Sequence, residues 1–154
     1  MSLFSCERDF ESALCAAART YYSTEEVFQI ETEETCAGFP DFMFWSFGTV
    51  KFAECKYASN HAFEVRRSQL RFYIRHPSMQ IHIAVYDPAS DWVYCLHAAQ
   101  ILDMVKERGP LVAFRKNGNA VIQLCGKAAG ETIPQFPYRA VSDAQDLHKV
   151  LCLL

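Results

Sequence analysis

The chain has 154 residues, of which 51% are hydrophobic, 14% aromatic and 21% charged. This length and composition predict one globular domain over residues 1–154 with a sizeable core. The apolar runs are shorter than the ~18 residues of a membrane span, and the acidic start "MSLFSCERDFESALC" does not resemble a secretion signal. A net charge of −3 argues against a general polyanion-binding protein but allows an enzyme with a local basic patch.

The seven cysteines are odd in number and lack C-x-x-C spacing. This pattern argues against a structural zinc site or an iron–sulfur cluster. It favours reduced, mostly buried thiols in a cytoplasmic protein, or in a nuclear one if the source is eukaryotic or viral.

Helices and β-hairpins alternate in the predicted chain order. Apolar residues at spacings of three and four predict a helix over 7–22 that buries Phe10, Leu14, Ala17, Ala18 and Tyr21. The glutamate-rich stretch 25–34 alternates partly and is interpreted as a solvated acidic edge strand. Two strands over 41–46 and 50–57 follow, joined by a turn at Phe47-Gly48.

The second half continues the same alternation. A helix over 61–75 is expected to end before Pro77. Strands over 79–87 and 91–97, a helix over 98–110 and a hairpin over 111–127 with Asn117-Gly118 at its turn come next. A loop over 128–139 leads to a last helix over 141–152. The predicted fold class is therefore mixed α/β.

Three charges interrupt the first hairpin, which is otherwise apolar. If Phe47 and Gly48 form a two-residue turn, opposed residues have numbers that sum to 95, and Asp41 faces Glu54. Lys56 shares the face of Glu54 because strand side chains alternate with period two. The register thus predicts that the three charges converge at one end of the hairpin.

Directly opposed carboxylates repel one another, and a divalent cation would relieve that repulsion. Mg²⁺ prefers carboxylate oxygens together with water and a phosphate. A lysine beside such an ion could orient a water molecule or stabilise charge developing on a phosphate. A simple ion pair between Lys56 and Glu54 or Asp41, on an exposed strand end, is the alternative.

The motif resembles that of the PD-(D/E)XK nucleases. Pro40-Asp41 is followed after twelve residues by Glu54-Cys55-Lys56, and Gln69 and Tyr73 form a Q-x-x-x-Y pattern, as in the RecB-like branch. Small Holliday-junction resolvases and virus-type replication-repair nucleases are also similar in size and layout. The resemblance covers about residues 7–96 and implies a restriction-endonuclease-like mixed sheet flanked by helices.

The resemblance also implies roles for residues of the motif. Asp41, Glu54 and the carbonyl of Cys55 would bind one or two Mg²⁺ ions, with Mn²⁺ as a substitute. Glu11, or Glu7 in the same helix, would complete the metal shell, although either could equally be a surface glutamate.

The remaining implied roles concern water and phosphate. Lys56 would position the attacking water or stabilise the phosphorus centre, and Gln69 would orient the lysine or a neighbouring phosphate. A glutamine within a helix can also be an ordinary surface residue, and Tyr73 can be an ordinary core residue.

Basic residues outside the motif are candidates for binding nucleic acid. Arg67, Arg71 and Arg75 recur at a spacing of four and form a stripe about 200° from Gln69 on a helical wheel, from the ~100° step per residue. This stripe is interpreted as a solvated face, a secondary DNA track or a partner surface. The candidate phosphate contacts are Arg66, Arg115, Lys116 and Lys127.

These observations favour a Mg²⁺-dependent nuclease acting on DNA, with RNA not excluded. The small size favours a structure-selective enzyme of resolvase type, which would need a homodimer to cut two strands symmetrically. The alternatives are a catalytically inactive nucleic-acid-binding or protein-interaction module on the same fold, and an unrelated α/β protein with a chance motif.

Overall fold

A computed structural model describes residues 1–23, 26–30, 37–128 and 131–154, with side chains at all of these except 127–128 and 131–133. Half of the acidic stretch expected as a strand over 25–34 lies outside the described residues. Its described part forms the short edge strand β1 (Val27–Gln29).

A six-stranded mixed sheet forms the centre of the molecule, in the order β1-β2-β3-β5-β6-β11. The central strands are β2 (Phe42–Ser46), β3 (Thr49–Tyr57), β5 (Ile81–Asp87) and β6 (Trp92–His97). β3 and β5 are parallel, whereas every other neighbouring pair is antiparallel. Since side chains alternate along each strand, β3 presents Glu54 and Lys56 to one face and Ala53 and Cys55 to the other.

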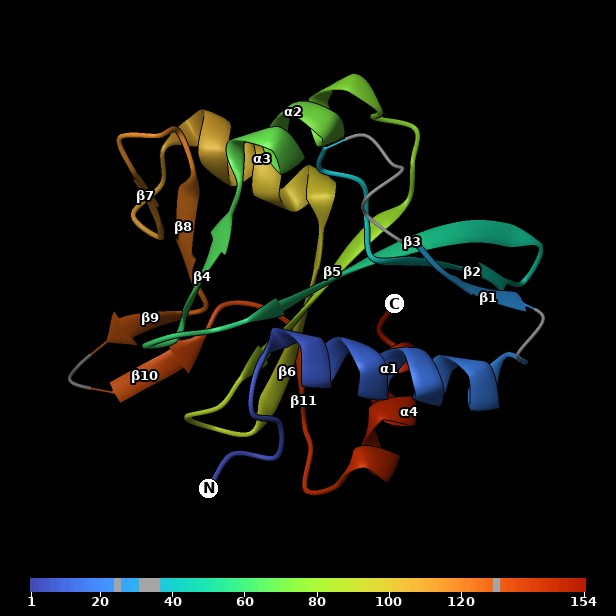
Figure 1. Cartoon of the computed structure of the whole chain (residues 1–154). Coiled ribbons are helices and arrows are strands. Elements are labelled where there is room, and N and C mark those ends of the chain that lie inside the picture. The colour runs from blue at the N-terminus through green and yellow to red at the C-terminus, as the bar shows by residue number, and fades with distance from the viewer. Residues whose placement is uncertain (24–25, 31–36, 129–130) are drawn as a thin grey trace.

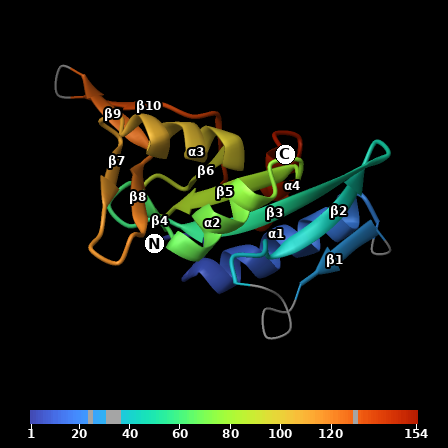
Figure 2. The same cartoon turned by 90° about the horizontal axis from the view of Figure 1, so that it is seen from above.

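Helices cover both faces of this sheet (Figures 1 and 2). α1 (Glu7–Tyr21) and α4 (Leu147–Leu151) lie on one face, and α2 (Arg67–Arg75) and α3 (Ala98–Glu107) on the other. The expectation of a mixed sheet flanked by helices is confirmed. In the described part of the chain, none of the helices is long and apolar enough to cross a membrane.

The core is divided by the sheet into two clusters. Phe10, Leu14 and Ala18 of α1 are buried against the first face, as the spacing predicted, but Tyr21 is 49% exposed, so its predicted burial is wrong. On the second face, Phe72 and Tyr73 of α2 pack with β5, β6 and α3. The second face also carries the acidic end of the first hairpin, so α2 is the element that covers the candidate site.

The helix predicted over 61–75 is wrong in its first third. Residues Ala62–Val65 form strand β4, and α2 begins only at Arg67. Phe63 and Val65 alternate with polar residues and are buried because β4 pairs with β8 (Ala120–Gln123), which is distant in sequence. A partner so far along the chain supplies the hydrogen bonds that decide between strand and helix.

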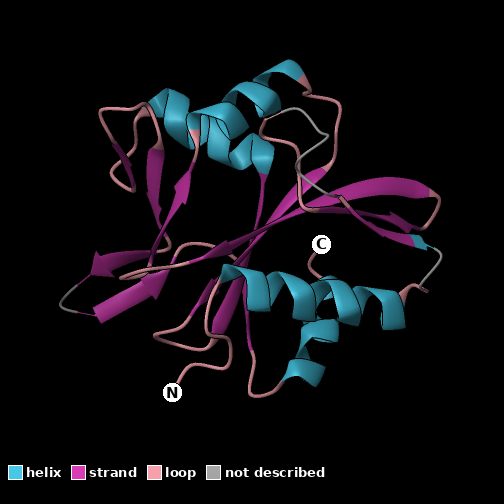
Figure 3. Ribbon diagram, viewed as in Figure 1, coloured by secondary structure: helices cyan, strands magenta, loops and turns pink. Residues whose placement is uncertain are grey.

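The chain after β6 differs from the prediction in three places (Figure 3). β7 (Val112–Phe114) and β8 form the expected hairpin, but β8 also joins β4 in a separate three-stranded sheet. The expected loop over 128–139 contains β10 (Glu131–Pro134), which pairs with β9 (Cys125–Ala128), and β11 (Tyr138–Ala140), which pairs with β6. The last helix is shorter than predicted and is preceded by a 3-10 turn over Ala144–Asp146.

Candidate active site

The register of the first hairpin is the one that the turn predicted. Paired residues run from Phe42–Ala53 to Ser46–Thr49, so their numbers sum to 95. Phe47 and Gly48 have φ of 50° and 76°, the left-handed values of a two-residue type I′ turn. Asp41 therefore lies at the start of β2, beside the part of β3 that carries Glu54 and Lys56.

Asp41 is tied to β3 through both its backbone and its side chain. Its N–H donates to the carbonyl of Ala53 over 3.0 Å, and its Oδ2 accepts a hydrogen bond of 2.7 Å from the N–H of Cys55. The carboxylate thus occupies the place where a longer β2 would offer a backbone carbonyl. This contact fixes Asp41 next to the E-x-K segment.

Glu54 is the centre of the group and is only 3% exposed. Its Oε1 lies 3.2 Å from Nζ of Lys56 and also accepts a hydrogen bond from Nε2 of Gln69. Among the described residues, none makes a hydrogen bond with its buried Oε2. A buried carboxylate oxygen of this kind is costly, and a bound water molecule or cation would satisfy it.

The first turn of α2 supplies Gln69. The backbone N–H of Arg66, just before the helix, donates to Gln69 Oε1 over 2.9 Å. The amide group is therefore held at both ends, with its oxygen on the helix start and its nitrogen on Glu54. One turn later, Tyr73 is buried in the core, and no residue in the described part of the chain makes a hydrogen bond with its hydroxyl.

The electrostatics of the site favour protonated carboxyl groups when no cation is bound. Burial, and then the charge of Glu54, raises the pKa of Asp41 to about 8, although the Cys55 N–H opposes the shift. Burial also raises the pKa of Glu54, whereas Lys56 lowers it. A carboxyl pair with raised pKa values in one place is typical of metal or acid–base sites, and also of structural ion-pair networks.

Gly38 allows the loop before Asp41 to reach α2. Its φ is +93°, and a Cβ atom there would lie 2.5 Å from the carbonyl oxygen of Ser68 and 3.0 Å from Cα of Gln69. Glycine is thus required both by the backbone conformation and by the space available. The loop "GFPD" and the start of α2 therefore pack backbone against backbone, next to the Gln69–Glu54 contact.

Two candidate residues of α1 lie near the group without joining it. Glu11 accepts a hydrogen bond of 3.2 Å from Nε2 of Gln29, and its charge raises the pKa of Asp41. The charge of Glu7 likewise raises the pKa of Glu54. Across residues 1–23, 26–30, 37–128 and 131–154, no three His, Cys, Asp or Glu side chains are grouped to hold a metal ion. Glu11 thus does not complete a set of three carboxylates in this structure.

A polar pocket of about 300 Å³ reaches Lys56 from the side of the three-stranded sheet β4-β8-β7, called the small sheet below. Arg66 lies at this pocket and is exposed, so it is the candidate phosphate contact nearest to the motif. It precedes the helix, so its place follows from the start of α2 and not from the predicted helical wheel. The lining residues are Glu7, Lys56, Tyr57, Glu64, Arg66 and Asn119.

The other candidate phosphate contacts lie farther along the chain. Arg115 forms an ion pair with Glu64 (Nε–Oε2 3.1 Å), and Lys116 is exposed in the same turn. The side chain of Lys127 lies outside those that the structure describes. The stripe of Arg67, Arg71 and Arg75 is exposed, whereas Gln69 is buried.

Sequence reasoning missed Asn119, Glu64 and the role of Gly38. The helix predicted over 61–75 contains Glu64, so its position in a strand beside Asn119 could not be inferred. A signal for Gly38 was present, because glycine is the residue that most readily allows a positive φ or a close approach between two backbone segments.

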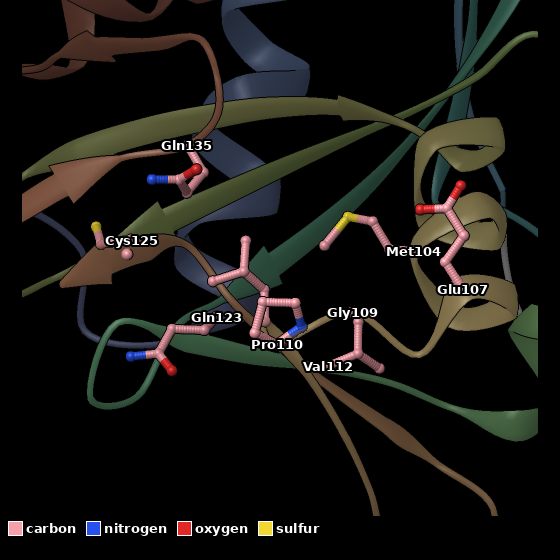
Figure 4. Close-up of a pocket in the computed structure, with 10 residues that line it drawn as sticks. Met104, Glu107, Gly109, Pro110, Val112, Gln123, Cys125 and Gln135 are labelled. Atoms are coloured by element: carbon pink, nitrogen blue, oxygen red, sulfur yellow. The ribbon is translucent and has the colours of Figure 1, made fainter. Parts of the chain in front are cut away.

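A second, larger pocket lies away from these residues (Figure 4). It has a volume of about 680 Å³ and is formed between the end of α3, the chain that enters β7, and β8 and β9. Glu107, Gln123, Cys125 and Gln135 are among the polar residues at its wall. None of the motif residues lines this pocket, so the pair of acids and not the larger cavity defines the candidate site.

Comparisons with known proteins give structural likeness only. No family model matches the sequence, and no curated protein matches it. Among solved structures, the chain is similar to D212, a nuclease from a fusellovirus, at 12% identity and a TM-score of 0.49, over 73% of this chain and 78% of that one. It is also similar to Hjc, a Holliday junction resolvase from the archaeal hyperthermophile Archaeoglobus fulgidus, at 13% identity and a TM-score of 0.44, over 76% and 80% of the two chains. At this level of likeness, neither structure assigns an activity or a site to the chain.

Proposed function

We propose that the chain is a metal-dependent nuclease that hydrolyses phosphodiester bonds in DNA. The observation that carries the proposal is the group around Glu54, in which a lysine and a glutamine hold one carboxylate oxygen while the other is buried and unpartnered. Asp41, fixed by the Cys55 N–H, supplies a second carboxylate beside it.

The residues present fit a divalent cation such as Mg²⁺, or Mn²⁺ in its place. Asp41 and the free oxygen of Glu54 would hold it, with water completing the shell, as Mg²⁺ prefers. The carbonyl oxygen of Cys55 would be a third metal ligand. The N–H and C=O groups of one strand residue point to the same edge of the strand, and the Cys55 N–H points towards Asp41. When bound, the cation would lower the pKa of a coordinated water and polarise a phosphate oxygen.

The protein groups around the acids have separate tasks in this proposal. Lys56 keeps its ammonium group beside Glu54 and at the floor of the polar pocket, where it can hold a water molecule or a phosphate oxygen. Gln69 fixes the orientation of the Glu54 carboxylate. Arg66, exposed at the same pocket, would contact a neighbouring phosphate of the strand.

Branched DNA is the substrate that we test first, because the small size of the chain favours a structure-selective enzyme. Wild-type protein is incubated with supercoiled plasmid, a four-way junction, a flap and a linear duplex, and with a matched RNA, in Mg²⁺, Mn²⁺, Ca²⁺ or EDTA. Cleavage in Mg²⁺ or Mn²⁺ that EDTA abolishes supports the proposal. Symmetrical cuts in the junction, together with a dimer in solution, would support the resolvase type.

Two variants connect such an activity to the site. Asp41→Ala and Glu54→Gln should abolish cleavage while a gel shift with DNA in Ca²⁺ survives, because basic groups supply most phosphate contacts. If the wild type binds DNA but leaves every substrate intact, the chain is a non-catalytic binding module. Cleavage by either variant at the wild-type rate would contradict the assignment of the site.

A further inference from the structure

Asn119 connects the turn between β7 and β8 to the end of β4 and the start of α2, which lie more than 50 residues earlier in the chain. Its Nδ2 donates to Oε1 of Glu64 in β4 over 2.6 Å, and its Oδ1 accepts a hydrogen bond of 3.0 Å from the N–H of Arg67. Its own carbonyl accepts from the N–H of Arg115 over 2.9 Å, which closes the turn between β7 and β8. Each of these contacts uses a different atom of the same residue.

The contact with Arg67 caps α2. Arg67 is the first residue of that helix, and the N–H groups of a first turn have no partner within the helix. Such groups are usually satisfied by a short polar side chain at the residue before the helix. That residue is Arg66, whose side chain makes no capping hydrogen bond, so Asn119 supplies the cap from the small sheet.

The capped turn is the one that orients Gln69. The N–H of Arg66 holds the oxygen of the Gln69 amide, and the nitrogen of that amide contacts Glu54. A shift of the helix start would therefore move the amide relative to the acid. From this chain of contacts we propose that Asn119 is a positioning residue, which holds the start of α2 so that Gln69 meets Glu54.

The contact between Glu64 and Asn119 can be tested by exchanging the carboxylate and the amide between the two positions. Glu64 Oε1 accepts from Asn119, and its Oε2 accepts from Arg115 over 3.1 Å. Asn119→Asp would place two carboxylates against each other, which is destabilising. In the double variant Glu64→Gln/Asn119→Asp, the new amide can donate to the new carboxylate and still accept from Arg115. The carboxylate at 119 can still accept from the Arg67 N–H.

The first readout does not depend on any activity. In ¹⁵N-labelled protein we expect Asn119→Ala and Asn119→Asp to shift the side-chain amide resonances of Gln69. In Asn119→Ala, exchange of the Arg67 N–H should become roughly fivefold faster, the factor that a lost hydrogen bond of ~1 kcal/mol sets. The double variant should return the Gln69 resonances towards the wild type. Unchanged Gln69 resonances in the folded single variants would overturn the proposal, as would a double variant no better than Asn119→Asp.

The second readout rests on the proposed nuclease activity. A displaced Gln69 amide would no longer hold the Glu54 carboxylate in place, so Asn119→Asp should lower kcat with little change in KM, and the double variant should restore kcat. A general loss of structure would weaken DNA binding together with kcat, and this result contradicts positioning. If the wild type cuts nothing, the proposed function fails, whereas the resonances of Gln69 still decide the role of Asn119.

Discussion

The carboxylate of Asp41 accepts a hydrogen bond of 2.7 Å from the backbone N–H of Cys55, the residue between Glu54 and Lys56. Because a backbone group makes this contact, no substitution of a neighbouring side chain removes it directly. It holds the two acids together despite their repulsion and despite burial, both of which raise the pKa of Asp41. Backbone contacts therefore hold the three charges of the first hairpin together, and this arrangement lowers folding stability when no metal cation is bound.

The raised pKa of Asp41 predicts how stability depends on pH. The pKa is about 8 in the folded chain, against an ordinary value of 3.8. The folded state therefore binds the proton more tightly, and stability is lost as the pH rises from about 4 to about 8. Asp41→Asn removes this loss, so in EDTA it should melt above the wild type at pH 8 and close to it at pH 4.

Thermal melts across that pH range check the prediction, with Asp103→Asn on the exposed side of α3 as the control. The melting temperature of this control variant should change with pH as that of the wild type does. If Asp41→Asn instead melts lower at pH 8, the carboxylate is stabilised by an ion pair with Lys56, and the repulsion between the acids does not dominate.

Lys56 should be essential for cleavage, while Lys51 on the same strand should not be. Lys56 lies beside Glu54, whereas Lys51 points to the opposite face and donates to the carbonyl of Leu154 over 2.9 Å. Lys56→Met should lower the rate by roughly 10²–10⁴, the range for positioned acid–base groups, and Lys51→Met should leave it within a few-fold.

Calorimetric titration with Mn²⁺ separates the roles of Lys56. Loss of a cation should leave metal affinity intact, so Lys56→Met should bind Mn²⁺ as the wild type does. A variant that no longer binds the ion would show that the lysine organises the site and does not act in the chemistry.

Gly38 and Gly48 make a matched pair of substitutions. Both have positive φ, but a Cβ at Gly38 would meet the backbone of Ser68 at 2.5 Å, whereas nothing lies within 4 Å at Gly48. Gly48→Ala should cost about 1 kcal/mol from the left-handed conformation alone. Gly38→Ala should cost clearly more in chemical denaturation and should also lower cleavage. Equal costs would mean that the loop moves away from α2 freely.

Arg66 and the stripe of Arg67, Arg71 and Arg75 should differ in their effect on DNA binding. Arg66 lies at the pocket of Lys56, and the stripe is on the solvent side of α2. Arg66→Ala should reduce the slope of log affinity against log salt by roughly 0.9, one phosphate contact. The triple alanine variant of the stripe should change it little. A reduction by about two or more in the triple variant would place the DNA path along the helix.

The sequence was sufficient for the parts of the site that depend on local geometry. The left-handed backbone conformation of Phe47 and Gly48 forms the two-residue turn that sets the register between β2 and β3. This register alone brings Asp41 next to Glu54 and Lys56. The spacing of two between Glu54 and Lys56 needs only the alternation of a strand. These positions could be predicted because each depends on residues fewer than twenty apart.

The small sheet could not be predicted, because its strands meet only in the folded chain. "AFEV" in β4 has the alternation of a strand, yet it runs directly into the helical spacing of α2, and nothing local separates the two. The pairing of Glu64 with Val121 in β8 decides the matter and also brings Asn119 to the helix start. The positioning role that we propose for Asn119 therefore depends on long-range contacts.

His82 predicts a second pH dependence, on the opposite face of the sheet and of opposite sign. Burial, followed by the charges of His97 and Lys51, lowers its pKa from 6.5 to about 3. Its Nε2 is buried and makes no hydrogen bond with any residue that the structure describes. Its ring lies 4.3 Å from that of His97 on the neighbouring strand. The unfolded chain binds the proton first, so stability should be lost as the pH falls from about 6.5 towards 3.

Substitution of His82 by an apolar residue should remove that loss. His82→Leu has no proton to take up, so its melting temperature should rise relative to that of the wild type as the pH falls from 7 to 4, whatever the difference between the two at pH 7. His148→Gln, at an exposed position of α4, serves as the control and should keep the wild-type slope. Thermal melts of the double variant Asp41→Asn/His82→Leu separate the two effects on stability. Asp41 lowers stability as the pH rises from 4 to 8, whereas His82 lowers it as the pH falls. If His82→Leu keeps the full acid loss, the histidine is protonated in the folded chain and the strands β5 and β6 open to admit water.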